Sequence, residues 1–257
     1  MPTAELSLPL PAAALWLAGA AAVFLLAGTV KGVVGLGLPT VAMALLALMM
    51  PPAEAAALLV VPSLVTNVWQ MRPWHTLAPL WRRLAPMQCG VCAGTWAGAW
   101  WLGAPEGDAA HLALGMALMG YAAWSLAGAR LSVPARHERW LGPLVGAATG
   151  AITAATGVFV VPAVPYLQAL GLQRDALVQA MGMSFTVSTL ALAVGLAGNA
   201  AFSVAGIGLS AVLLLPALGG MALGHWLRQR LSPTAFRSCM LGSLLVLGGY
   251  MVWSGVA

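Results

Sequence analysis

The stretch Gly28-Thr-Val-Lys-Gly-Val-Val-Gly-Leu-Gly-Leu-Pro39 decides how this chain folds, because it places four glycines inside a long apolar run. A second stretch, Gly146-Ala-Ala-Thr-Gly150, repeats its beginning and runs on to Gly157 and Pro162. Glycine is a poor residue for a helix interior. Irregular backbone at membrane depth is tolerated only where protein or a water-filled cavity satisfies its polar groups. The two stretches therefore predict two related halves, each with an irregular spot that is a candidate site.

The composition is that of an all-α polytopic membrane protein. Of the 257 residues, 61% are hydrophobic and 7% are charged, whereas about 25% are charged in a typical soluble domain. The net charge of +5 arises from Lys and Arg residues in a few short breaks between apolar runs. Because these residues form no basic face, we expect no nucleic-acid partner and a lipid bilayer as the surroundings.

The apolar runs define ten candidate helical segments, five in each half. They lie near 12–30, 38–50, 54–71, 84–102, 111–129, 141–157, 158–170, 176–197, 203–226 and 236–256. A helix needs about 20 apolar residues to cross the hydrocarbon. The second and seventh segments are shorter than that, and each follows a Gly motif, so we expect discontinuous or re-entrant helices there.

We expect one transmembrane domain made of a first repeat at 12–129, a cytoplasmic connecting loop at 130–140 and a second repeat at 141–256. Basic residues lie in three breaks, whereas the break with Glu106 and Asp108 has neither Lys nor Arg. By the positive-inside rule the basic breaks face the cytoplasm, which places both termini outside, in a bacterial inner membrane. An odd number of crossings in each half makes the two repeats inverted. This architecture is common in secondary transporters.

Four stretches carry a family resemblance in the same order along both halves: Gly28–Pro39, Val61–Gln70, Thr156–Gln168 and Gln179–Thr189. Over nearly its whole length the chain resembles the sulfite exporter TauE/SafE family, also called the TSUP family of membrane anion transporters. The resemblance implies transport of sulfur-containing anions such as sulfite, sulfonates or sulfoacetate-like compounds. The second copy has Thr153-Ala-Ala155 where the first has Gly35-Leu-Gly37, so we expect the two half-sites to differ.

Lys31 is the only lysine in the chain and lies in an apolar region. Ionisable residues within a membrane are costly and are functional candidates by default. A substrate anion would offset that cost. The alternative is a topological anchor whose side chain snorkels to the headgroups. The counterpart of Lys31 in the second copy is Thr149.

The glycines of the two motifs fall into two groups. Four of them form small-xxx-small pairs, for which helix packing is the favoured interpretation: Gly28 with Gly32, and Gly146 with Gly150. Gly35, Gly37 and Gly157 directly precede the short segments. Backbone N–H groups and the positive end of a half-helix could bind an anion there, and a simple turn is the alternative.

Neutral polar side chains cluster on the segments that follow the short ones. These candidates for substrate binding are Asn67, Gln70, Gln179, Ser184 and Ser188. Three further candidates, Thr149, Thr153 and Thr156, are spaced three or four apart on one helical face. Interhelical hydrogen bonds, or bonds from each Thr to its own helix, are the structural alternatives. The acidic Glu54 and Asp175 lie at expected helix starts, where a carboxylate interacts favourably with the helix dipole. We therefore interpret them as helix-capping residues, with proton coupling as the alternative.

We expect a secondary transporter that moves a small sulfur-containing anion by alternating access, with no catalytic role, cofactor or metal centre. The sequence leaves open whether a proton or sodium ion is coupled and whether the chain forms a homodimer. An anion channel is the main alternative. An intramembrane enzyme is a weaker one, since only Lys31 with Ser63 or Thr40 would offer a catalytic pair.

Overall fold

The computed structural model describes residues 10–128, 131–199, 204–230 and 232–256. Within these ranges the chain forms ten α-helices and one short 3-10 helix. In order they are α1 (Leu10–Val34), α2 (Leu38–Leu46), α3 (Pro52–Gln70), η1 (Trp74–Thr76), α4 (Leu77–Leu102), α5 (Gly107–Ala127), α6 (Ala135–Thr156), α7 (Ala163–Ala169), α8 (Arg174–Gly198), α9 (Val204–Arg228) and α10 (Pro233–Val256). The fold is all-helical in the described residues, as predicted.

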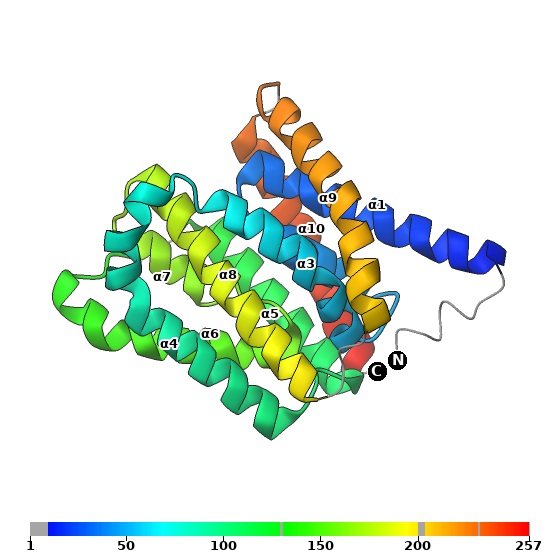
Figure 1. Ribbon diagram of the computed structural model, residues 1–257, viewed down its shortest axis with the longest axis horizontal. Helices are drawn as coiled ribbons and strands as arrows, with labels where there is room; N and C mark the ends of the chain where they lie inside the picture. The colour runs from blue at the N-terminus through cyan, green and yellow to red at the C-terminus, as the bar shows by residue number, and fades with distance from the viewer. Residues whose placement is uncertain (1–9, 129–130, 200–203, 231, 257) are drawn as a thin grey trace.

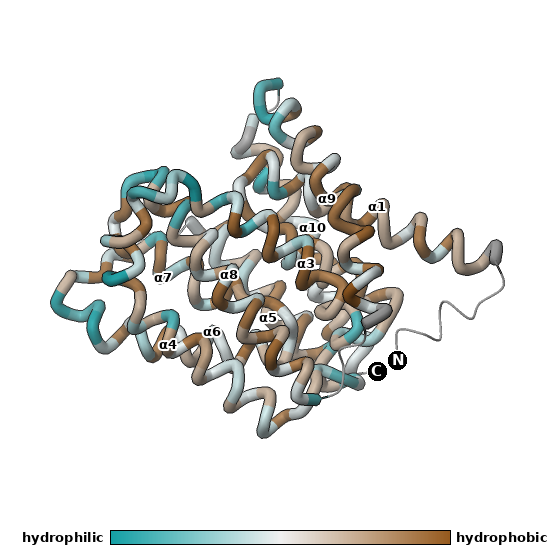
Figure 2. Tube along the Cα trace, viewed as in Figure 1, coloured by the Kyte–Doolittle hydropathy of each residue, from teal (hydrophilic) through white to brown (hydrophobic). Residues whose placement is uncertain are grey.

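Six of these helices are long and apolar enough to cross a membrane, namely α1, α3, α5, α8, α9 and α10. Large apolar side chains such as Leu15, Leu215, Val246 and Trp253 are mostly exposed on the outside of the bundle. Exposed apolar surface on this scale requires an apolar surrounding. Hydrophilic residues gather at the loops between helices and apolar residues along them (Figure 2). The chain is therefore a multi-pass membrane protein.

The two short helices lie where the glycine motifs predicted them. Helix α2 has 9 residues and α7 has 7, too few to cross the hydrocarbon. Gly37, the residue before α2, has φ +114°, and Gly157, which ends α6, has φ +69°. Side chains with a Cβ rarely adopt such backbone angles. Each motif therefore ends one helix and lets a short one start in a new direction.

Glycines bring α1 and α9 into backbone contact. A Cβ added at Gly28 would lie 2.2 Å from the carbonyl oxygen of Ala217, and one at Gly220 would lie 2.0 Å from that of Leu25. Gly32 and Gly224 repeat this arrangement one turn further along both helices. The expectation that Gly28 and Gly32 serve helix packing is confirmed, and the order of the contacts shows that α1 and α9 run parallel.

Helices α4 and α6 meet in the same way. A Cβ at Gly94 would lie 2.1 Å from the oxygen of Ala147, and one at Gly146 would lie 2.1 Å from that of Met87. Gly90 and Gly150 complete the set. The helices that face the two motifs share a second duplicated pattern, Pro-x3-Gly-x3-Gly, at 86–94 in α4 and 216–224 in α9. Sequence reasoning had not found this pattern.

Helices α3 and α8 cross near the centre of the bundle, with α1, α9 and α10 on one side and α4, α6 and α7 on the other (Figure 1). They run antiparallel, since Gln70 near the end of α3 contacts Val178 and Gly182 near the start of α8. Helices α5 and α10 are also antiparallel, because Gly115 lies against Gly248, whereas the earlier residue Leu112 lies against the later Gly255.

A serine of α9 satisfies the backbone where a proline interrupts α3. Pro62 has no N–H to donate to the carbonyl of Leu58. The Ser210 hydroxyl donates to that carbonyl at 2.7 Å and accepts a bond from the Val61 N–H at 3.2 Å. Because an unpaired backbone group at membrane depth costs several kcal/mol, this contact lets α3 carry a proline in the bundle.

The basic breaks are shorter than expected, because several arginines lie inside helices. Arg82 and Arg83 are in the first turns of α4, and Arg237 is in the second turn of α10. Arg83 forms an ion pair with Glu138 in the first turn of α6 at 2.7 Å and donates to the Leu170 carbonyl at 3.2 Å. Long arginine side chains reach from a helix to the membrane surface, so a hydropathy profile starts these helices too late, at 84, 141 and 236 where the helices start at Leu77, Ala135 and Pro233.

Candidate functional site

Lys31 lies in the last turn of α1 and is 3% exposed. Its ammonium donates one hydrogen bond to the Thr66 hydroxyl of α3 at 3.0 Å and another to the Asn67 side-chain oxygen. The side chain therefore points into the bundle and pairs with α3. This geometry argues against the alternative of a lysine that snorkels to the headgroups.

The partners of Lys31 have neutral side chains, and the acidic residue of α3 is far away. Glu54 is in the first turn of α3, thirteen residues before Asn67, which is about 20 Å along a helix axis at about 1.5 Å per residue. The Thr66 hydroxyl donates its own proton to the carbonyl of Pro62 at 2.7 Å. Its oxygen lone pairs are thus free to accept the hydrogen bond from Lys31.

Two more buried polar atoms lie on the same face of α3 without a partner. The Asn67 amide nitrogen and the Ser63 hydroxyl have no hydrogen-bond partner among the described residues, and these side chains are 0% and 1% exposed. Ser63 precedes Asn67 by four residues, so both lie on one helical face. A buried amide or hydroxyl normally has a partner, and leaving one unpaired costs about 1–3 kcal/mol. These groups, with the Lys31 ammonium, form a set of donors that suits an anion.

Gln70 connects three elements at the end of α3. Its amide nitrogen donates to the carbonyl of Gly35 at 3.0 Å and to that of Val178 in α8 at 3.2 Å. The N–H of Gly35 bonds to the Lys31 carbonyl at 2.8 Å. The polar backbone groups of Gly35 are thus used to end α1 and to hold Gln70. Gly37 accepts the first hydrogen bond of α2 from Val41 at 2.8 Å.

Gln179 holds the loop after α3 against α8. Its amide donates to the carbonyls of Met71 and Pro73, each at 2.7 Å, and it exchanges bonds with the Thr76 hydroxyl. This side chain lies near Gln70 in the fold, but its hydrogen bonds are made within the protein. It fastens the end of α3 to the start of α8.

The serines of α8 lie further along the helix. Ser184 accepts a hydrogen bond from the amide of Gln88 in α4 at 2.8 Å. Ser188 is 1% exposed. Sequence reasoning missed Gln88, although a lone amide inside a spanning segment is a signal for interhelical hydrogen bonding.

The three threonines of α6 bond back to their own helix. Thr149, Thr153 and Thr156 donate to the carbonyls four residues earlier, at 2.8, 2.7 and 2.7 Å. Their hydroxyl protons are thus engaged within α6, as the structural alternative proposes. The turn at Gly157 packs on side chains, because a Cβ there would lie 2.9 Å from Met43 Cε. The fold brings Lys31, Thr66 and Asn67 together and leaves the threonine row outside that cluster's hydrogen bonds.

Comparison with known proteins shows the family of the chain. No curated protein and no solved structure matches the chain. The family model described as Sulfite exporter TauE/SafE matches residues 20–251, which include Lys31, Thr66 and Asn67. Its members are membrane transporters, in keeping with the multi-pass fold. The chain therefore belongs to the sulfite exporter TauE/SafE family.

Proposed function

We propose that this protein is a secondary transporter of a small sulfur-containing oxyanion and that Lys31, Thr66, Asn67 and Ser63 form the core of its binding site. The observation that carries the proposal is the buried Lys31 ammonium, which is held by two neutral side chains of α3. A buried charge is costly unless a counter-charge and hydrogen bonds compensate it. A bound anion supplies both.

The chemistry of the cluster favours an oxyanion over a chloride-like ion. The cluster offers three N–H or O–H donors. The Lys31 ammonium lies at the end of α1, and the Asn67 amide and the Ser63 hydroxyl lie on one face of α3. Sulfite and sulfonate groups each carry three acceptor oxygens, so several donors can bind one group at once. Charge-assisted hydrogen bonds of this kind are shorter and stronger than neutral ones.

The directions of the helices support an inverted repeat. If α1–α5 correspond to α6–α10, the pair α1 with α9 corresponds to α6 with α4, and both pairs are parallel and joined by glycines. The pairs α3 with α8 and α5 with α10 each join corresponding helices, and both are antiparallel. Opposite directions of corresponding helices are what an inverted repeat requires. Such repeats are the usual basis of alternating access.

The distribution of charged residues supports one orientation in the membrane. The start of α4, the start of α6 and the end of α7 meet at the Arg83–Glu138 ion pair, at one end of the bundle. Arg72 and Arg174 lie beside the loop and helix start that Gln179 joins. We infer that this arginine-rich end faces the cytoplasm of a bacterial inner membrane and that both termini lie outside. Reporter fusions at the C-terminus test this, because an active cytoplasmic reporter there would contradict it.

The central experiment measures uptake of labelled sulfite into proteoliposomes with the wild type, Lys31→Met and Arg139→Gln. We expect Lys31→Met to raise KM at least about tenfold, since hydrogen bonds to a charged group contribute about 1.5–3 kcal/mol. Arg139→Gln removes an exposed arginine of α6 and should leave KM unchanged. Unaltered kinetics in Lys31→Met would refute the binding role.

The substrate class needs a separate test. We expect sulfite, thiosulfate or a small sulfonate to raise the apparent melting temperature of the purified wild type, and not that of Lys31→Met, since a ligand that binds the native state stabilises it. A carrier also shows saturable flux and counterflow, whereas a channel shows neither. Repeating the uptake with proton and sodium gradients imposed in turn identifies the coupled ion.

A further inference from the structure

Two pockets adjoin at one edge of the bundle: residues of α5, α6 and α7 line the first, and residues of α5, α7, α8 and α10 line the second. The first, of about 450 Å³, has almost only carbon atoms on its surface and includes Tyr121, Leu141 and Val145 in its lining. The second, of about 500 Å³, includes Ser125, Gln168 and Arg237. Four residues line both pockets: Trp124, Leu131, Pro165 and Ala169. The two pockets thus form one continuous groove with an apolar half and a polar half.

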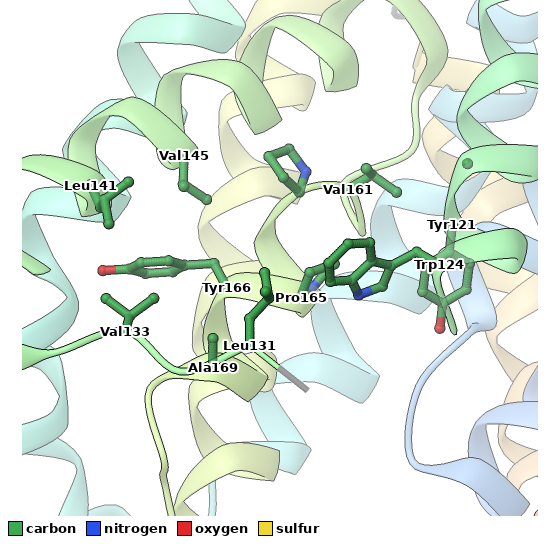
Figure 3. A pocket seen from close by; sticks show the side chains of 12 residues that line it. Tyr121, Trp124, Leu131, Val133, Leu141, Val145, Val161, Pro165, Tyr166 and Ala169 are labelled. Carbon is green, nitrogen blue, oxygen red and sulfur yellow. The ribbon is translucent and has the colours of Figure 1, made fainter. Parts of the chain in front are cut away.

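The side chains of the apolar half follow one another along its length. Figure 3 shows the ring of Tyr166, the side chains of Leu131 and Pro165 and the indole of Trp124 along the groove. Leu131 is 57% exposed, so this half opens to the surroundings of the bundle. A surface of this kind in a membrane protein is in contact with acyl chains.

The polar half lies at the helix ends, and the apolar half lies deeper. Gly128 directly follows the end of α5, and Arg237 is in the second turn of α10. Val145 is in the middle of α6, about three turns from its start. A molecule in the groove would therefore have its polar part at the membrane surface and its apolar part in the hydrocarbon.

The charge of the polar half is positive. Arg237 lines this half and is the one charged residue in the two linings among the described residues. Neither lining contains an aspartate or a glutamate among the described residues. A guanidinium is suited to phosphate because it presents several N–H donors in a plane.

We propose that this groove binds an anionic phospholipid, with the phosphate at Arg237 and one acyl chain in the pocket between Tyr121 and Tyr166. The site is independent of the transport site at Lys31. A larger pocket of about 880 Å³ between α1, α2 and α10 provides an internal comparison, because no charged residue lines it. It offers room for a chain without an anchor for the headgroup.

Native mass spectrometry of the purified full chain tests the proposal, with long-chain phosphatidylglycerol and phosphatidylcholine as the lipids. We expect the wild type to prefer phosphatidylglycerol. Arg237→Gln should bind phosphatidylglycerol about tenfold more weakly, because the bond of a charged group to phosphate is lost. Arg228→Gln, which removes an exposed arginine of α9 outside both linings, should keep the preference.

Gly120→Leu tests the apolar half without a clash, because nothing lies within 4 Å of a Cβ added there and Gly120 lines the pocket. We expect it to weaken binding of long-chain phosphatidylglycerol and to leave binding of the dihexanoyl form unchanged. The proposal is overturned if Arg237→Gln binds phosphatidylglycerol like the wild type. It is also overturned if millimolar inorganic phosphate displaces the lipid and Gly120→Leu has no effect, since the groove would then be a simple anion site.

Discussion

Replacing Gly220 by alanine should separate α1 from α9 and destabilise the protein. The added Cβ would lie 2.0 Å from the Leu25 carbonyl oxygen, whereas ordinary contact begins at 3.4 Å. Because the atom in the way is backbone, no side-chain rotation relieves the clash, and the helices must move apart by about 1.4 Å. Gly208 on the same helix offers the matched control, since nothing lies within 4 Å of a Cβ there.

The size of the effect follows from the loss of contact along the interface. Overpacking a tight contact costs about 1–3 kcal/mol, and a gap of about 1 Å forfeits up to about half of each dispersion contact along the two helices. We therefore expect the free energy of unfolding to fall by about 3 kcal/mol. For a chain of this size that lowers the apparent Tm by about 6–12 °C. Gly208→Ala should leave Tm unchanged or raise it slightly, because alanine favours a helix.

The assay is thermal unfolding of the three proteins in detergent, followed by near-ultraviolet circular dichroism of the tryptophans. If Gly220→Ala melts together with the wild type, the helices do not depend on backbone contact at this point and the explanation of the glycine motifs is wrong. Equal destabilisation by Gly208→Ala would also refute it, since the effect would then come from the loss of any glycine in α9.

Three other predictions concern the polar side chains. In a double-mutant cycle of Lys31→Met and Asn67→Leu, each single change leaves a buried partner unpaired. The double variant should therefore lose about 1–3 kcal/mol less free energy of unfolding than the sum of the two single variants. Additive losses would contradict the contact between the two side chains. Gln179→Ala should speed proteolysis of the loop that the glutamine holds at Met71, seen as earlier chymotryptic cleavage after Trp74, and an unchanged rate would exclude the fastening role. Thr149→Val should change Tm and sulfite KM little, within about 0.5 kcal/mol, because its hydroxyl bonds only to its own helix; a large change in KM would give it a substrate contact.

The main architecture was predictable because it depends on local signals. Apolar runs of sufficient length predict the spanning helices. The breaks at Gly37 and Gly157 follow from backbone angles that side chains with a Cβ rarely adopt. The packing role of Gly28 is likewise a local pattern. Each of these features depends on a few neighbouring residues, so it can be predicted without knowing which other helix packs against them.

Partners across the fold were much less predictable. The sequence marks Lys31 as unusual, but the identity of Thr66 as an acceptor depends on the angle at which α1 meets α3. Gln179 and Gln88 are both amides within apolar segments. Gln179 holds the loop after α3, whereas Gln88 of α4 donates a hydrogen bond to Ser184 of α8. Composition cannot distinguish these roles, because they are decided by which backbone carbonyl or hydroxyl lies within 3.5 Å after packing.

The asymmetry between the two glycine motifs has a physical reason. Thr149 stands where an exact copy of the first motif would place a second lysine, and its hydroxyl is satisfied within α6. A second buried ammonium would need its own acceptors, and without an anion the two charges would repel each other in a medium of low dielectric constant. A single lysine already has two acceptors in Thr66 and Asn67, and in the proposed site its charge would attract an anion. Under the proposed alternating-access mechanism, an inverted repeat with a single charge would bind and release its substrate from either side without burying two unpaired cations.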